Sequence, residues 1–242
     1  MMELNICHLY PDLLNLYGDG GNIIAMKKRL EWRNIECHIH NVTLHDSFEQ
    51  DKYDIVFIGG GQDFEQEVIL KDLKGDKTKR LKEAVESNVC FLGICGGYQL
   101  LGNYYQTWDH HQFDFIGALD LYTIGDKKRM IGDFVFSCPD ILNLDVVGFE
   151  NHSGKTFLGN SVRPLGTIKK GYGNNGQDQT EGARYKNVFC SYSHGSLLPK
   201  NPKLCDVILD TALYRKYRVN INEALHDEYE NEANQFILNR LL

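Results

Sequence analysis

The sequence predicts an α/β protein built on an open, mostly parallel β-sheet with helices on both faces. In the first hundred residues, short apolar runs alternate with segments of helical periodicity, which is typical of a parallel sheet. The runs at 53–58 and 88–94 are almost entirely apolar, as expected for strands that helices bury on both faces. A chain of 242 residues can bury a core without disulfides or metals.

The predicted elements follow from hydrophobic periodicity and turn residues. Strands are expected at 4–10, 35–42, 53–58 and 88–94. Helices are expected at 23–32, 64–87 (broken near Gly75), 96–105, 201–217 and 225–241. Strand signals and glycine-rich turns dominate from about 117 to 193. We expect a single domain over 1–242, with a C-terminal helical segment at about 201–242.

Composition argues against several classes of protein. Lys plus Arg is 26 and Asp plus Glu is 33, a net charge of −7, which is the wrong sign for a nucleic-acid binder. The apolar runs are too short to span a membrane, and the N-terminus does not have the basic region of a signal peptide. Seven cysteines without a C-x-x-C pattern indicate reduced thiols, so we expect a cytoplasmic location.

Cys95 stands where a buried strand is expected to turn into a helix. The segment reads Gly93-Ile94-Cys95-Gly96-Gly97-Tyr98-Gln99, the form of a nucleophile elbow. Its glycines leave room for a strained backbone that lifts the sulfur above the carboxyl edge of the sheet. Because the following helix N-terminus favours a thiolate, we predict that Cys95 is a nucleophile. The alternative is a buried core thiol like Cys90.

A second glycine-rich turn follows the strand at 53–58. Gly59, Gly60 and Gly61 would lie at the same edge of the sheet. One of their N–H groups, together with that of Gly96, could hold a developing oxyanion. A phosphate-cradling loop is the weaker alternative, because no G-K-[ST] follows the glycines.

Among nine histidines, His194 is predicted to be the catalytic base. It ends the strand-like run 187–193 and precedes a glycine, so its side chain would reach the edge where sites on parallel sheets form. His38 and His40 alternate along a strand with His45 nearby. No Cys or carboxylate completes a ligand set there at the usual spacing, so no metal site is predicted.

Together these motifs resemble a class I (triad) glutamine amidotransferase, of the cobyric acid synthase-like branch. The resemblance rests on the elbow, on the triple glycine upstream and on Tyr192-Ser193-His194-Gly195 downstream. Further matching segments are 15–22, 148–156, 171–175 and 186–195. The resemblance extends to about Tyr217 and implies the flavodoxin-like fold of that class.

The resemblance implies roles for individual residues. Cys95 would attack the side-chain amide of L-glutamine, and His194 would take the thiol proton. Arg129 would bind the glutamine α-carboxylate, for which a guanidinium fork is suited; the alternative is a solvated arginine on a charged turn. The other substrate-binding positions that it implies are Gly60, Gly61, Gly96 and Gln99. His152 is expected to be a structural or interface residue.

The resemblance also implies a partner. Ammonia would pass to a Mur-ligase-like (MurT-like) subunit in a heterodimer at the inner face of the membrane. That subunit would amidate the D-glutamate α-carboxyl of lipid II in peptidoglycan synthesis. No ATP-site motif is found in this sequence, so ATP and Mg are expected in the partner, and no cofactor or metal is expected here. Alternatives are another acceptor, such as a cobyrinic-acid-type substrate, or a non-catalytic regulatory subunit.

One departure from the class concerns the third member of the triad. Most class I amidotransferases have His-x-Glu, whereas this sequence has His194-Gly195-Ser196. We expect the orienting carboxylate to come from the partner ligase, with a bare Cys–His dyad as the next interpretation. The candidates within this chain are Asp19 and Glu150. A rival enzyme class, the DJ-1/protease-like proteins, shares the elbow, but the triple glycine and Arg129 argue against it.

Overall fold

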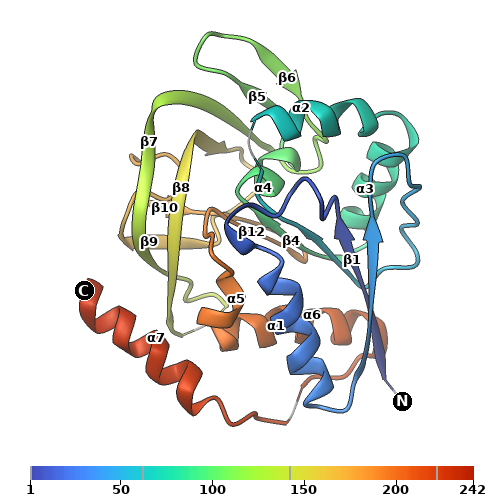
Figure 1. Ribbon diagram of the computed structural model, residues 1–242, viewed down its shortest axis with the longest axis vertical. Coiled ribbons are helices and arrows are strands. Elements are labelled where there is room, and N and C mark those ends of the chain that lie inside the picture. The colour runs from blue at the N-terminus through green and yellow to red at the C-terminus, as the bar shows by residue number, and fades with distance from the viewer. Residues whose placement is uncertain (1, 62, 142, 222) are drawn as a thin grey trace.

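The computed structural model describes residues 2–61, 63–141, 143–221 and 223–242 and contains two six-stranded sheets (Figure 1). The first sheet has the order β11-β12-β4-β3-β1-β2. Its strands are β1 (Glu3–Leu9), β2 (Glu36–Val42), β3 (Ile55–Ile58), β4 (Cys90–Ile94), β11 (Ala183–Tyr185) and β12 (Val188–Ser191). All neighbours in it are parallel except β11 and β12. The predicted open, mostly parallel sheet is therefore confirmed.

Helices lie on both faces of the first sheet. They are α1 (Gly21–Glu31), α2 (Asp63–Asp72), α3 (Asp76–Glu86), α4 (Gly96–Leu100), α5 (Leu197–Lys200) and α6 (Pro202–Tyr217). The C-terminal helix α7 (Glu228–Leu241) packs against α5 and the second sheet. The crossover from β1 to β2 runs in the opposite direction along the sheet from the crossover between β3 and β4. Because such crossovers are right-handed, α1 and α3 lie on opposite faces. Helix α6 packs on the same side as α1 (Figure 1).

The second sheet is mostly antiparallel and was not predicted as a separate layer. Its strands are β5 (Tyr104–Gln106), β6 (Gln112–Asp114), β7 (Leu121–Ser137), β8 (Asp145–Leu158), β9 (Gly166–Lys170) and β10 (Thr180–Glu181). The long strands β7 and β8 run side by side (Figure 1). The strands expected between 117 and 193 are therefore confirmed, but most of them belong to this second sheet.

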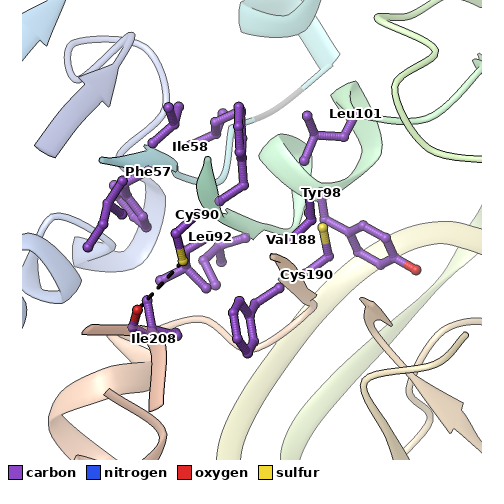
Figure 2. Packing of buried hydrophobic residues seen from close by; sticks show 14 of the residues in the cluster. Phe57, Ile58, Cys90, Leu92, Tyr98, Leu101, Val188, Cys190 and Ile208 are labelled. Carbon is purple, nitrogen blue, oxygen red and sulfur yellow. Dashed lines mark hydrogen bonds between the residues drawn. The ribbon is translucent and has the colours of Figure 1, made fainter. Parts of the chain in front are cut away.

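The core below the elbow is apolar and closely packed. Figure 2 shows side chains of β3, β4, α4, β12 and α6 meeting there, including Phe57, Leu92 and Tyr98. Cys90 is fully buried, and its thiol donates to the carbonyl oxygen of Ile208 at 3.7 Å. Five of the cysteines other than Cys95 are buried like small hydrophobic side chains, and Cys37 is half-buried.

One predicted helix ends earlier than expected, and another is divided where the sequence predicts. The helix expected at 96–105 ends at Leu100, and the chain turns at Gly102 into β5. A Cβ on Gly102 would lie 2.9 Å from the Leu121 carbonyl oxygen, so the close approach of β7 requires this glycine. The helix expected at 64–87 is divided as predicted near Gly75, which has φ +59°.

A buried arginine joins α1 to the C-terminal segment. The Arg29 guanidinium donates to both carboxylate oxygens of Asp206 on α6, at 2.6 Å, and to those of Asp227, just before α7, at 2.7 and 2.8 Å. Its side chain is 4% exposed.

Within the described residues, no helix is both long and apolar enough to cross a membrane.

Replacing Arg29 should destabilise the fold. Arg29→Ala removes the Arg29 contacts of Asp227 and leaves Asp206 paired with Arg33, and breaking such a buried ion pair costs about 3 kcal/mol. Lys28→Ala is the matched control on the same helix, because Lys28 is exposed and its ion pair is with the exposed Glu31; its expected cost is below about 0.5 kcal/mol. Urea unfolding measures both free energies, and equal values would contradict the assignment.

Candidate active site

Cys95 lies between β4 and α4, at the carboxyl edge of the first sheet. Its backbone has φ 48° and ψ −103°, which is strained for a residue with a side chain. A Cβ on Gly97 would lie 2.3 Å from the Ile58 carbonyl oxygen, so only glycine fits behind the turn. The Cys95 N–H donates to the Ser191 carbonyl at 2.9 Å. The predicted strand–elbow–helix arrangement is confirmed.

His194 reaches the same edge from the end of β12, the neighbour of β4. Its N–H donates to the Phe149 carbonyl at 2.7 Å, and its side chain is fully buried. Nδ1 lies 3.1 Å from Oδ2 of Asp19, which leaves Nε2 as the ring nitrogen available to the Cys95 sulfur and to a substrate.

The pKa of His194 is raised to about 10. Burial lowers this pKa, but the Cys95 sulfur and the Asp19 carboxylate both favour the protonated ring and outweigh burial.

Asp19 is the carboxylate that contacts the His194 ring. It follows a 3-10 turn (Leu16–Gly18) and is fully buried. Its Oδ2 also accepts the Gly60 N–H at 2.8 Å. Ser196, which stands where the class has Glu, donates its hydroxyl to the Gly18 carbonyl at 2.7 Å. Ser196 therefore supports the turn that delivers the acid.

This arrangement provides a carboxylate from within the chain, whereas the sequence analysis expects one from the partner ligase; the partner's contribution stays a prediction. The carboxylate at His194 belongs to this chain, and it is Asp19 of the two internal candidates. The other candidate, Glu150, accepts the backbone N–H groups of Tyr172 and Gly173 at 2.7 and 3.0 Å. Glu150 therefore organises the 171–173 turn and does not contact His194 in the described hydrogen bonds.

The three glycines after β3 make different contacts. The Gly59 carbonyl accepts the Gly97 N–H at 3.0 Å. Gly60 packs against the base, since a Cβ there would lie 2.3 Å from Cε1 of His194. The Gly60 N–H donates to Asp19. It is therefore engaged, and it is not the glycine N–H that the sequence analysis expects to hold an oxyanion. Gly61 lines the cavity next to Cys95.

A cavity of about 220 Å³ opens on Cys95. Its lining residues are Leu16, Gly61, Cys95, Gln99, Tyr105, Arg129, Asn151, His152, Ser153 and Gly154. The structure thus brings Cys95 together with three of the predicted substrate-binding residues, which are Gly61, Gln99 and Arg129. Gly96, at the first position of α4, follows Cys95 directly, and the first N–H groups of a helix have no partner within it.

Arg129 owes its place to an irregularity in the second sheet. The register of β7 against β8 shifts between Gly125 and Met130, and such a bulge re-aims side chains. Arg129 Nε donates to Oδ1 of Asn151 at 2.8 Å, and Nη2 donates to the Asn151 carbonyl at 3.0 Å. These contacts hold the guanidinium of this exposed residue at the cavity wall.

A buried polar group behind the cavity was not predicted from the sequence. His152 stacks on Tyr192 with ring centroids 3.6 Å apart and an 8° tilt. The Tyr192 hydroxyl contacts Thr156 at 2.6 Å and accepts from Gln99 Nε2 at 3.1 Å. His152 is buried, as a structural residue would be, yet it also lines the cavity.

Glu181 is a further buried carboxylate that the sequence analysis missed. Its Oε1 accepts the Ser191 hydroxyl at 2.6 Å and the Tyr192 N–H at 2.9 Å. Burial raises the pKa of Glu181 to about 8. Because the carbonyl of Ser191 also holds the Cys95 N–H, Glu181 fixes the strand that leads to the base. No sequence motif marks this residue.

The one group that could ligate a metal, within the part of the chain described, lies at the other end of β1. Glu3, Glu36 and His38 approach one another there. Glu3 also lies 3.6 Å from Lys216, and the carboxylates are partly exposed. The cavity at Cys95 lies at the opposite, carboxyl edge of the sheet.

The sequence is similar to subunits of lipid II isoglutaminyl synthases. The lipid II isoglutaminyl synthase (glutamine-hydrolyzing) subunit GatD of Staphylococcus aureus is 41% identical over 99% of this chain and 97% of its own length. The subunit of the same name from Streptococcus pneumoniae is 40% identical over 93% of this chain and 86% of its own length.

A solved structure supports the fold independently. The crystal structure of a glutamine amidotransferase from Thermotoga maritima has a TM-score of 0.52 at 15% identity, covering 98% of this chain and 97% of its own. Residues 5–202 match the family described as CobB/CobQ-like glutamine amidotransferase domain. Because this match covers most of the chain, the chain belongs to the CobB/CobQ-like glutamine amidotransferases.

Proposed function

We propose that this chain is the glutaminase subunit of a lipid II isoglutaminyl synthase. The observation that carries the proposed chemistry is the set Cys95–His194–Asp19 at a cavity that Arg129 also lines. The acceptor is proposed from the likeness to two GatD subunits along most of the chain. Their name describes a glutamine-hydrolysing subunit, which agrees with this site.

The first half of the reaction forms a thioester. Arg129 binds the α-carboxylate of L-glutamine. The proton of the Cys95 thiol already rests on His194 Nε2 when the sulfur attacks the side-chain amide carbon. The N–H groups of Gly96 and Gly61 stabilise the oxyanion. His194 Nε2 then gives its proton to the amide nitrogen, the C–N bond breaks, and ammonia leaves.

The second half regenerates the enzyme. A water molecule gives a proton to His194 and attacks the γ-glutamyl thioester carbon. The C–S bond breaks, the sulfur returns to its starting state, and glutamate is released. Asp19 keeps Nδ1 protonated and the ring in one orientation through both halves.

The ammonia is proposed to pass to a MurT-like, Mur-ligase-like partner in a heterodimer. That partner would use ATP and Mg to activate the α-carboxyl of D-glutamate in lipid II, and ammonia would convert it to D-isoglutamine. The complex would work in the cytoplasm, at the inner face of the membrane.

Reconstitution tests the proposed acceptor. The chain, its co-purified ligase, ATP and amide-¹⁵N-glutamine are incubated with lipid II and, separately, with a cobyrinic-acid-type acceptor. We expect ¹⁵N in D-isoglutamine only with lipid II. Label in the corrinoid would overturn the acceptor. Glutamine that stays intact with either acceptor would support a non-catalytic regulatory subunit.

Cys95→Ser should lower glutamine hydrolysis by several orders of magnitude while the fold is retained, because one sulfur is exchanged for a poorer nucleophile. Cys90→Ser is the matched control five residues upstream and should keep most of the activity. Glutamate release measures both. Comparable rates for Cys95→Ser and the wild type would exclude the nucleophile.

Arg129→Ala should mainly raise KM, because the guanidinium would bind the ground state and the transition state alike. Arg129→Lys should recover only part of the affinity, since an ammonium cannot replace the fork. Lys128→Ala, one residue away, serves as the control with an unchanged KM. An unchanged KM in Arg129→Ala would remove this residue from the site.

Asp19→Asn should slow glutamine hydrolysis by about 10²- to 10⁴-fold, as loss of the orienting acid does in related triads. Because Asp19 contributes to the raised pKa of His194, the alkaline limb of the pH–rate profile should move to lower pH. Both are measured on the chain with and without its ligase. A wild-type rate and profile in this variant would assign the acid to another carboxylate.

A further inference from the structure

Tyr17 lies between the proposed base and the proposed substrate anchor. It sits inside the 3-10 turn two residues before Asp19, with φ 55° and ψ 24°. A left-handed backbone is unfavourable for an aromatic residue by about 1 kcal/mol or more. The side chain is 46% exposed, so burial of the ring does not explain why the strain is kept.

The ring of Tyr17 contacts the base. It meets the His194 imidazole edge-on, with centroids 5.0 Å apart and an interplanar angle of 72°. Because Asp19 already fixes Nδ1 of the same ring, the imidazole is held on one side by a hydrogen bond and on another by an aromatic edge.

The hydroxyl of Tyr17 contacts Asn151, which binds the Arg129 guanidinium. It accepts a hydrogen bond from Nδ2 of Asn151, at 2.5 Å. Asn151 uses its other amide atom, Oδ1, and its backbone carbonyl to accept from the Arg129 guanidinium. The amide of Asn151 therefore has a donor side fixed by Tyr17 and an acceptor side that fixes Arg129.

We infer that Tyr17 is a positioning residue that couples the substrate-carboxylate subsite to the catalytic base. This inference rests on the proposed function. The hydroxyl orders Asn151 and, through it, the guanidinium fork, so it acts on binding. The ring holds the imidazole toward Cys95, so it acts on the chemical step. The strained turn persists because one side chain serves both ends of the substrate.

Alkylation of Cys95 by a chloroketone analogue of glutamine separates the two effects, because KI reports binding and kinact reports the reactivity of the thiolate. It is measured on the full chain together with its ligase. Tyr17→Phe removes only the hydroxyl, and we expect KI to rise about 5-fold, as for one hydrogen bond, with kinact unchanged. Tyr17→Ala also removes the ring contact, and kinact should fall about 10-fold or more.

Two controls make the result specific to coupling. Tyr214→Phe, at an exposed tyrosine of α6, should leave KI and kinact at wild-type values. In an Arg129→Ala background, Tyr17→Phe should have no further effect on KI, because the group that it positions is gone. A purely structural role would lower binding equally in both backgrounds.

The outcomes separate this inference from the proposed function. If wild-type protein is alkylated at Cys95 but Tyr17→Phe has a wild-type KI, or Tyr17→Ala a wild-type kinact, the inference is overturned. Equal losses with and without Arg129 would also overturn it. If the wild-type protein is not alkylated at Cys95, the proposed function itself is wrong.

Discussion

The carboxylate of Asp19 is the contact on which the arrangement of the site depends. A single oxygen accepts from the His194 ring and from the Gly60 N–H. The turn after β1, the end of β3 and the end of β12 are therefore tied to one buried anion. Burial lowers the pKa of His194, but the neighbouring Cys95 sulfur and this carboxylate together raise it above its ordinary value.

The two sheets divide the remaining work. The first sheet delivers the reacting groups from the carboxyl ends of its strands, as open parallel sheets commonly do. The second sheet supplies the cavity wall through β7 and β8, where a bulge presents Arg129 against Asn151. Tyr17 lies where the two sets meet, because its ring touches the base and its hydroxyl touches Asn151.

Features that depend on short-range sterics were predictable from the sequence. The elbow at Cys95 follows from its glycines, and His194 follows from a strand end. Asp19 could only be named as one of two internal candidates, and a partner's carboxylate was preferred. It is 175 residues from His194 in sequence, and no local pattern reports that distance. The use of the Gly60 N–H and the packing of His152 on Tyr192 likewise arise only from tertiary contacts.

The state of the His194 ring tests the central claim most directly. The ¹⁵N and ¹H signals of its imidazole can be followed by NMR against pH in histidine-labelled protein, and the His194→Ala variant assigns them. The account predicts a ring protonated on both nitrogens at neutral pH that titrates near pH 10, and at lower pH in Asp19→Asn. A neutral ring with an ordinary pKa of about 6.5, unaffected by Asp19→Asn, would contradict it.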